Sequence, residues 1–371
     1  MIKKTINFNV LDRQYQKYAN EYNRAVVRVL ESGWYILGKE LEKFELKYAE
    51  FFGKKYCVGL NSGLDALTLA FRALAIGRGD EVIVQANTYI ASVIGIIENG
   101  ATPIFVEPDD FYNIDVDKIE TAITTKTKAI LPVHLYGQPC NMRKIKKLAN
   151  KYNLFIVEDC AQSHGACING QMTGTFGDIG CFSFYPTKNL GGFGDSGAIV
   201  TDNSELAEKI RMLRNYGSKT KYQNELEGVN SRLDEIQAAL LNVKLKYLKE
   251  ITEERKKIAD RYLLKVKNKN IVLPRKLKEA DHVYHLFVIQ CQDRNKLQNF
   301  LLKNKIKTQV HYPIPPHLAN CYKKLGYSKG DFPITENYSN QILSLPLYNG
   351  MTDEEVDYVV KFVNDFQVDV L

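Results

Sequence analysis

One lysine stands alone in an otherwise apolar and aromatic segment. The run from Phe182 to Lys188 (FSFYPTK) is typical of the exit from a strand, and Lys188 is its only cation. Burial in such surroundings disfavours the ammonium form of a lysine and favours a neutral, nucleophilic amine. Lys188 is therefore the first candidate for covalent chemistry.

Two other segments could act together with this lysine. Glu158 and Asp159 end a strand at the carboxyl edge where open α/β sheets bind ligands, although an acid there is usually a cap or a metal ligand. Ser62, Gly63 and Leu64 lie where a strand turns into a helix, so backbone N–H groups could bind a phosphate, but a plain serine N-cap explains them equally well. A phosphate cradle, a carboxylate and a desolvated lysine are together what pyridoxal phosphate requires.

Alternating strand and helix patterns predict the scaffold that positions these residues. Runs of Val, Ile and Leu alternate with amphipathic segments, which is typical of a mostly parallel sheet covered on both faces. Two helices around a turn at residues 32–33 are expected over 21–53, and the segment 185–196 is predicted to be a functional loop. We expect strands over 56–60, 81–85, 103–106, 127–133, 154–158, 180–184 and 197–201, and helices over 64–75, 91–99, 116–123 and 141–151.

The pattern changes in the last third of the chain. A helical stretch with few breakers over 233–267 is followed by a predicted strand at 283–290, a helix at 294–303 and a proline-rich loop at 312–316. We therefore predict a large α/β domain over 1–250, which includes the N-terminal helical segment, and a smaller α+β domain over 251–371.

Length and composition exclude several classes of protein. The 371 residues are 45% hydrophobic and 25% charged, as in ordinary globular domains. The seven cysteines are scattered and include no C-x-x-C pair, so we expect reduced thiols and a cytoplasmic protein. The net charge of +7 is spread among alternating lysines and glutamates, which favours a solvated surface and no nucleic-acid partner. The longest near-apolar run, 89–97, is too short to span a membrane.

Two further motifs do not predict the sites that they suggest at first. Glycines 192, 194 and 197 satisfy G-x-G-x-x-G, but they precede a strand, whereas a dinucleotide site requires that they follow one. His282 and His285 form the only close pair among the six histidines, and they lie at a predicted strand start. No metal site is expected there.

Four blocks of sequence carry a resemblance to a known family. Residues 61–67, 158–164, 182–188 and 228–237 resemble the signature blocks of the DegT/DnrJ/EryC1/StrS family of nucleotide-sugar aminotransferases, and the likeness extends from Ile6 to Leu347. This resemblance implies a type I PLP-dependent transferase fold, which is like that of aspartate aminotransferase. It also implies a homodimer whose active site is shared between the subunits.

The resemblance also implies roles for single residues. Lys188 stands at the position of the lysine that bonds covalently to the cofactor, and Asp159 at that of the carboxylate under the pyridine nitrogen. Leu64 departs from the threonine that many members have, so a backbone amide must replace a hydroxyl. The dehydratase branch carries histidine at position 188 and is disfavoured. The other implied cofactor contacts are Gln162 at the phenolic oxygen, Tyr89 on the ring, Gly63, Leu64 and Ser183 at the phosphate, and Asn230 from the partner subunit.

Residues 32–38 and 216–222 are similar to those of members that aminate C3. We expect transfer of an amino group from L-glutamate to C3 of a dTDP-3-keto-6-deoxyhexose. The product would be a dTDP-3-amino-3,6-dideoxyhexose for lipopolysaccharide or another surface glycan, with the gluco or galacto configuration left open. The alternatives are amination at C4 of a UDP- or dTDP-4-keto-6-deoxy sugar and, from another class, a non-catalytic regulatory protein.

Candidates for contact with the sugar nucleotide come from three segments. Tyr35 lies in the first similar segment, and Lys219, Lys221 and Tyr222 lie in a polar loop that could bind the diphosphate and base, although an ordinary surface loop is nearly as good an explanation. In the stretch from Tyr312 to His317, one of these two residues could lie near the sugar. The alternative for this stretch is a rigid turn.

Overall fold

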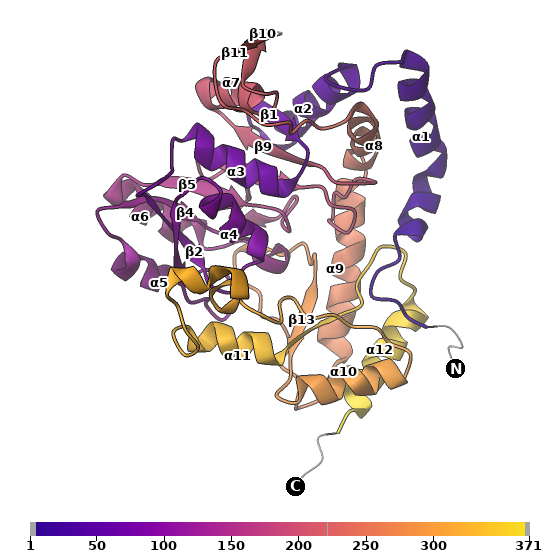
Figure 1. Cartoon of the computed structure of the whole chain (residues 1–371). Coiled ribbons are helices and arrows are strands. Elements are labelled where there is room, and N and C mark those ends of the chain that lie inside the picture. The colour runs from indigo at the N-terminus through magenta and orange to yellow at the C-terminus, as the bar shows by residue number, and fades with distance from the viewer. Residues whose placement is uncertain (1–4, 221, 368–371) are drawn as a thin grey trace.

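A computed structural model describes residues 5–220 and 222–367 of the chain. Its centre is a seven-stranded sheet with the order β1-β9-β8-β5-β4-β2-β3 (Figure 1). Neighbouring strands run parallel except for β9, which is antiparallel to both β1 and β8. The predicted α/β fold with a mostly parallel sheet is confirmed. The strands are β1 (Tyr56–Leu60), β2 (Glu81–Gln85), β3 (Thr102–Val106), β4 (Thr127–Leu131), β5 (Phe155–Asp159), β8 (Ile179–Ser183) and β9 (Gly197–Thr201).

Helices cover both faces of this sheet because successive residues of each strand point to opposite sides. In β2, Val82 and Val84 join the cluster formed with α3 (Gly63–Ala73), α4 (Ile90–Ile97) and α7 (Ser204–Leu213). Ile83 between them joins the cluster formed with α5 (Val116–Ile119) and α6 (Met142–Tyr152). The predicted α5 is shorter than expected, since residues 120–122 form a 3-10 turn.

The two N-terminal helices pack against the helix that follows the sheet. Helices α1 (Leu11–Ser32) and α2 (Lys39–Phe52) both contact α8 (Glu235–Leu245), and α9 (Leu248–Lys265) continues beyond it. The helical stretch predicted over 233–267 is therefore confirmed, but it consists of two helices with a break at residues 246–247. No glycine or proline marks the break. Tyr247, at the break, stacks on Tyr18 of α1 at a ring distance of 4.1 Å.

The C-terminal part has a core of its own. Strand β13 (Phe287–Gln290) pairs antiparallel with β14 (Ile342–Leu345), and α10 (Arg294–Lys303), α11 (Pro333–Gln341) and α12 (Asp353–Asp365) surround them at the lower end of the view in Figure 1. Ile6 belongs to this core and pairs with Ile306, so a residue that precedes α1 packs with the last third of the chain. The division of the chain at residue 250 stays a prediction.

Two small sheets complete the structure. Strands β6 (Cys167–Ile168), β7 (Gln171–Met172) and β12 (Ala280–Asp281) form one of them. Strands β10 (Ser218–Thr220) and β11 (Gln223–Asn224) form a hairpin that projects beyond α7 at the opposite end from α10 and α12 (Figure 1). In the described residues, no helix is both long and apolar enough to cross a membrane.

Candidate active site

A cavity of about 460 Å³ opens at the carboxyl ends of the central strands. It is bounded by the end of β5, the end of β8, the start of α3 and the loop 185–196 that follows β8. Eight of the predicted cofactor and sugar-nucleotide residues line this cavity, although they come from five separate segments of the chain. They are Gly63, Leu64, Tyr89, Asp159, Gln162, Ser183, Lys188 and Tyr312.

Lys188 sits in a tight turn just beyond β8. Its backbone N–H donates to the Tyr185 carbonyl at 2.8 Å, and the side chain lines the cavity. Burial lowers the pKa of the Lys188 amine to about 8, and the neighbouring Asp159 opposes this shift without reversing it. A substantial fraction of the amine is therefore neutral near physiological pH, as the apolar sequence around it predicts.

Asp159 is held rigidly at the last position of β5. The side chain is 5% exposed, and its Oδ2 atom accepts from Ser92 Oγ at 2.8 Å while Oδ1 accepts from the Ala161 N–H at 3.1 Å. Ser92 lies in α4, so strand and helix together fix the carboxylate at the cavity wall. A carboxylate in this position can stabilise a positive charge in the cavity.

Gln162 and two tyrosines, Tyr89 and Tyr312, line another part of the cavity. Gln162 Oε1 accepts from the Tyr136 N–H at 2.6 Å, and its Nε2 donates to the Tyr312 hydroxyl at 3.0 Å. The Tyr312 ring lies 4.9 Å from the Tyr89 ring. Tyr89 is 50% exposed, so one side of its ring remains available for a second flat group.

The start of α3 offers backbone donors to the cavity. Ser62 caps the helix because its Oγ accepts from the Asp65 N–H at 3.0 Å, which is the plain structural role that the sequence allowed. Among the described residues, the N–H groups of Gly63 and Leu64 have no acceptor. A Cβ at position 63 would lie 2.5 Å from Ser183 Cβ, so the close approach of β8 to this helix requires glycine.

These groups fit pyridoxal phosphate, the cofactor predicted from the sequence. Free N–H groups at a helix start bind phosphate, and a lysine with a lowered pKa can bond to an aldehyde. A fixed carboxylate can pair with a protonated ring nitrogen, and a half-exposed tyrosine ring can stack on it. Each of these four requirements is met by a described residue on the wall of one cavity.

Several predicted site residues do not line this cavity in the single chain. Asn230 is exposed and forms an isolated bridge with Asn215. Lys219 of the β10–β11 hairpin pairs with Glu208 at 2.6 Å, and Tyr222 is 86% exposed. Lys221 lies outside the described residues. The roles of Asn230, Lys219 and Tyr222 stay predictions.

Tyr35 and His317 also lie away from the cavity. Tyr35 is 48% exposed, and its carbonyl accepts from the Glu235 N–H at the start of α8. His317 is 2% exposed, bonds to Glu336 at 3.2 Å and packs edge-on against Phe332. This environment matches the rigid turn that the sequence left open for His317, and of that stretch Tyr312 is the residue on the cavity wall.

Two histidines that the sequence analysis did not place in the site, His285 and His311, both line the cavity. Burial lowers the pKa of His311 to about 4 and that of His285 well below its usual value, so both rings are neutral. Lys188 adds to the shift in each case. The sequence pattern places His285 only at the start of a predicted strand. For His311, the signal that could have pointed to the site is its position next to Tyr312.

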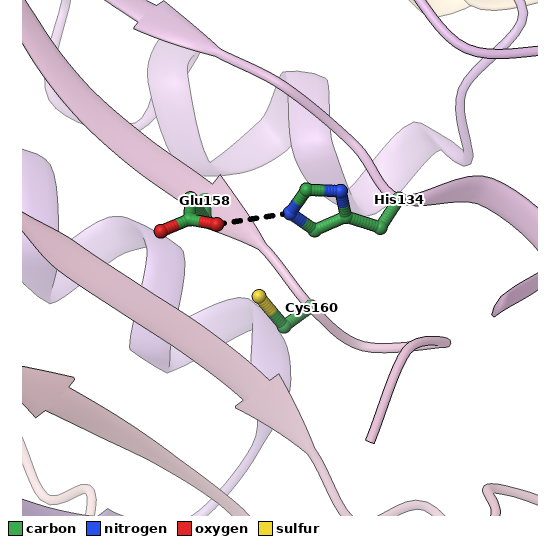
Figure 2. A group of neighbouring side chains, drawn as sticks. All are labelled: His134, Glu158 and Cys160. Atoms are coloured by element: carbon green, nitrogen blue, oxygen red, sulfur yellow. Dashed lines mark hydrogen bonds and ion pairs between the residues drawn. The ribbon is translucent and has the colours of Figure 1, made fainter. Parts of the chain in front are cut away.

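Behind Asp159, a buried group of potential metal ligands serves the fold. Figure 2 shows His134, Glu158 and Cys160 pointing toward one another. The Glu158 carboxylate accepts from His134 Nε2 at 3.1 Å and from three backbone N–H groups of residues 174–177 at 2.8 Å each. Burial raises the pKa of the Cys160 thiol well above its usual value, so the sulfur stays protonated. The carboxylate is fully used in fastening the loop 174–177 to β5.

Comparison with known proteins agrees with this geometry. Residues 16–364 match the DegT/DnrJ/EryC1/StrS aminotransferase family, and the chain belongs to that family. It is 53% identical, over 94% of its length and 96% of the relative, to the dTDP-3-amino-3,6-dideoxy-alpha-D-galactopyranose transaminase of Aneurinibacillus thermoaerophilus.

Solved structures show the same fold. The crystal structure of DesV from Streptomyces venezuelae in complex with a ketimine intermediate matches with a TM-score of 0.97 and 44% identity, covering 99% of this chain and 100% of that one. The structure of NtdA from Bacillus subtilis with bound cofactor PMP matches with a TM-score of 0.90 and 34% identity, covering 98% of this chain and 85% of that one.

Proposed function

We propose that the chain is a pyridoxal-phosphate-dependent aminotransferase that transfers an amino group from L-glutamate to C3 of a dTDP-3-keto-6-deoxyhexose. One observation carries the proposal. Lys188, Asp159 and the open start of α3 meet at one cavity, in a chain that is 53% identical to a transaminase of a dTDP-3-amino-3,6-dideoxyhexose. The product would be a dTDP-3-amino-3,6-dideoxyhexose for a surface glycan.

Each wall of the cavity has a part in holding the cofactor. Gly63 and Leu64 would bind the phosphate through their N–H groups, with Ser183 adding a hydroxyl. Asp159 would pair with the ring nitrogen, and Tyr89 would cover the ring. When bound, pyridoxal phosphate supplies an aldehyde that takes up the amino group and a ring that withdraws electrons from the neighbouring carbon.

Lys188 has the properties of the proton carrier in this reaction. The pKa of its amine is about 8, so Nζ can both accept and return a proton near neutral pH. The proton would come from the carbon that carries the amino group of a substrate bound in the cavity. The backbone turn to Tyr185 limits where Nζ can move. Gln162 is fixed by the Tyr136 N–H and so presents its Nε2 group at a constant place.

The partners are part of the proposal. We expect a cytoplasmic homodimer in which Asn230 of one subunit reaches the phosphate site of the other, since it does not line the cavity with Lys188 in its own chain. Exposed aromatic side chains support such a contact, among them Trp34 at 63% exposure and Tyr35 at 48%. Lys219 and Tyr222 of the projecting hairpin would then meet the nucleotide across the interface.

The test is a comparison of amino acceptors with L-glutamate as the donor. Purified holoenzyme is given dTDP-3-keto-6-deoxyglucose, dTDP-3-keto-6-deoxygalactose, a dTDP-4-keto-6-deoxy sugar or a UDP-4-keto sugar, and NMR of the product identifies the aminated carbon. We expect turnover of a dTDP-3-keto sugar and parallel double-reciprocal plots, since the amino group passes through the enzyme in two half-reactions. Turnover of the 4-keto sugars alone would overturn the assignment to C3.

A further inference from the structure

We propose that helix α8 positions the active-site lysine by holding the loop 184–196 at two points, through Gln237 and Lys244. The inference rests on the proposed function, because only there does Lys188 act in catalysis. Gln237 and Lys244 are seven residues apart, two turns of helix, so their side chains leave α8 on the same face. Both reach the loop that carries Lys188.

The first point of contact is a buried amine. Lys244 is 3% exposed, and its Nζ donates to the Gly191 carbonyl at 2.9 Å. In the part of the chain that the structure describes, this carbonyl is its one hydrogen-bond partner. A Cβ at position 191 would lie 2.3 Å from the Pro186 carbonyl oxygen, so Gly191 packs directly on the beginning of the loop. Holding Gly191 therefore also holds Pro186, two residues before Lys188.

The second point of contact, through Gln237, accounts for two of the glycines in the G-x-G-x-x-G pattern. Gln237 Oε1 accepts from the Phe193 N–H at 2.9 Å. A Cβ at position 192 would lie 2.9 Å from Gln237 Oε1, and one at position 194 would lie 2.9 Å from Gln237 Nε2. Glycines 192 and 194 thus leave the space into which the Gln237 amide fits. The loop is shaped to receive α8.

The chemistry of Lys244 favours positioning over simple packing. Burial, with a smaller contribution from Arg255, lowers the pKa of the Lys244 amine to about 7. The ammonium and the neutral amine both donate hydrogen bonds, so the contact with Gly191 persists on either side of that pH. An apolar side chain would fill the space without the cost of burying an amine. What the amine adds is a hydrogen bond that fixes the position of the Gly191 carbonyl.

The experiment compares two disrupting variants with two controls. Lys244→Met and Gln237→Met remove the two contacts, whereas Gln237→Glu keeps the acceptor for the Phe193 N–H. Asn242→Leu alters a buried side chain of the same helix that bonds to Glu40 of α2 and not to the loop. Amide hydrogen exchange of residues 184–196 is followed in the apoprotein and holoenzyme, together with the spectral rate of the half-reaction with L-glutamate.

We expect exchange in residues 184–196 to be at least about tenfold faster in both methionine variants, and the half-reaction to be about 10- to 100-fold slower. Gln237→Glu should restore most of the rate, and Asn242→Leu should leave the loop unchanged. Should Lys244→Met fail to fold, the two Gln237 variants decide alone. Unchanged exchange, an equal change in Asn242→Leu, or faster exchange with an unchanged rate would each overturn the inference.

Failure of this inference and failure of the proposed function give different results. An active wild-type enzyme whose loop and rate do not depend on α8 would refute the positioning role alone. A wild-type protein that shows no reaction with L-glutamate or with any keto-sugar nucleotide would refute the proposed function, and the positioning role with it.

Discussion

The chain holds its predicted cofactor residues and its predicted sugar-nucleotide residues in very different ways. The inner set lines one cavity beside the ends of β5 and β8, and its best-fixed members, Asp159 and Gln162, are each 5% exposed and each make two side-chain hydrogen bonds. The outer set (Tyr35, Lys219 and Tyr222) lies on loops and a projecting hairpin, where Tyr222 is 86% exposed.

The difference indicates which part of the site one chain can build. Positions at the end of a buried sheet are fixed by the packing of the whole core, so their geometry is complete within a monomer. Exposed loop residues make few packing contacts, so no single position of their side chains is strongly stabilised. Their final placement depends on what docks against them. We therefore expect the inner set to govern both half-reactions and the outer set to affect only the second.

The largest effect is expected for Lys188→Ala. Loss of the one amine with the required pKa on the cavity wall should lower turnover by about 10³-fold or more and remove the visible absorbance that comes from covalent attachment of the cofactor. Both half-reactions should fail together. Retention of full turnover by this variant would refute the assignment of Lys188, with circular dichroism as the control for folding.

A smaller but still large effect is expected for Asp159→Asn. The amide keeps the size of the side chain while the charge is lost: its oxygen can still accept from the Ala161 N–H, and its NH2 group can donate to Ser92 Oγ, which now donates to the carboxylate. We expect the glutamate half-reaction to slow by about 10²-fold, because a fixed charge no longer stabilises the ring nitrogen. Stopped-flow spectroscopy measures this step by itself. A rate within twofold of the wild type would show that the carboxylate is structural.

The places of Asp159 and Lys188 could be predicted from local signals in the sequence. Strand periodicity placed Asp159 at a strand end, and the apolar neighbours of Lys188 predicted its lowered pKa. His285 and His311 were missed, since the last third of the chain brings them to the cavity from far away in sequence. The break between α8 and α9 was missed for the same reason: the stacking of Tyr247 on Tyr18 cannot be read from the local pattern.

The rate at which pyridoxal phosphate binds to the apoprotein is expected to change about tenfold for each pH unit below the pKa of Lys188. Since burial lowers the pKa of Lys188 to about 8, the reactive neutral amine is depleted tenfold for each pH unit below that value and is fully present above it. The rate of binding should rise with pH, reach half of its maximum near pH 8 and level off above that value. Asp159 raises this pKa, so Asp159→Asn should move the midpoint lower. If the midpoint of this pH dependence lies near the pKa of an exposed lysine, burial does not lower the pKa of Lys188.

The smallest effect, and the most direct test of the contrast between inner and outer sets, is expected for Lys219→Ala. In the single chain, Lys219 pairs only with Glu208 in the described residues, and both side chains are more than half exposed, so stability should hardly change. If the hairpin meets the nucleotide in the dimer, KM for the sugar nucleotide should rise about two- to fivefold, as expected for one solvated ion pair. The glutamate half-reaction should stay unchanged.

Glu208→Gln is the matched control, because it breaks the same ion pair but leaves the lysine free to bind a diphosphate. An equal rise in KM for both variants would mean that the hairpin acts through its own ion pair, whereas a slower glutamate half-reaction in Lys219→Ala would place this lysine with the inner set.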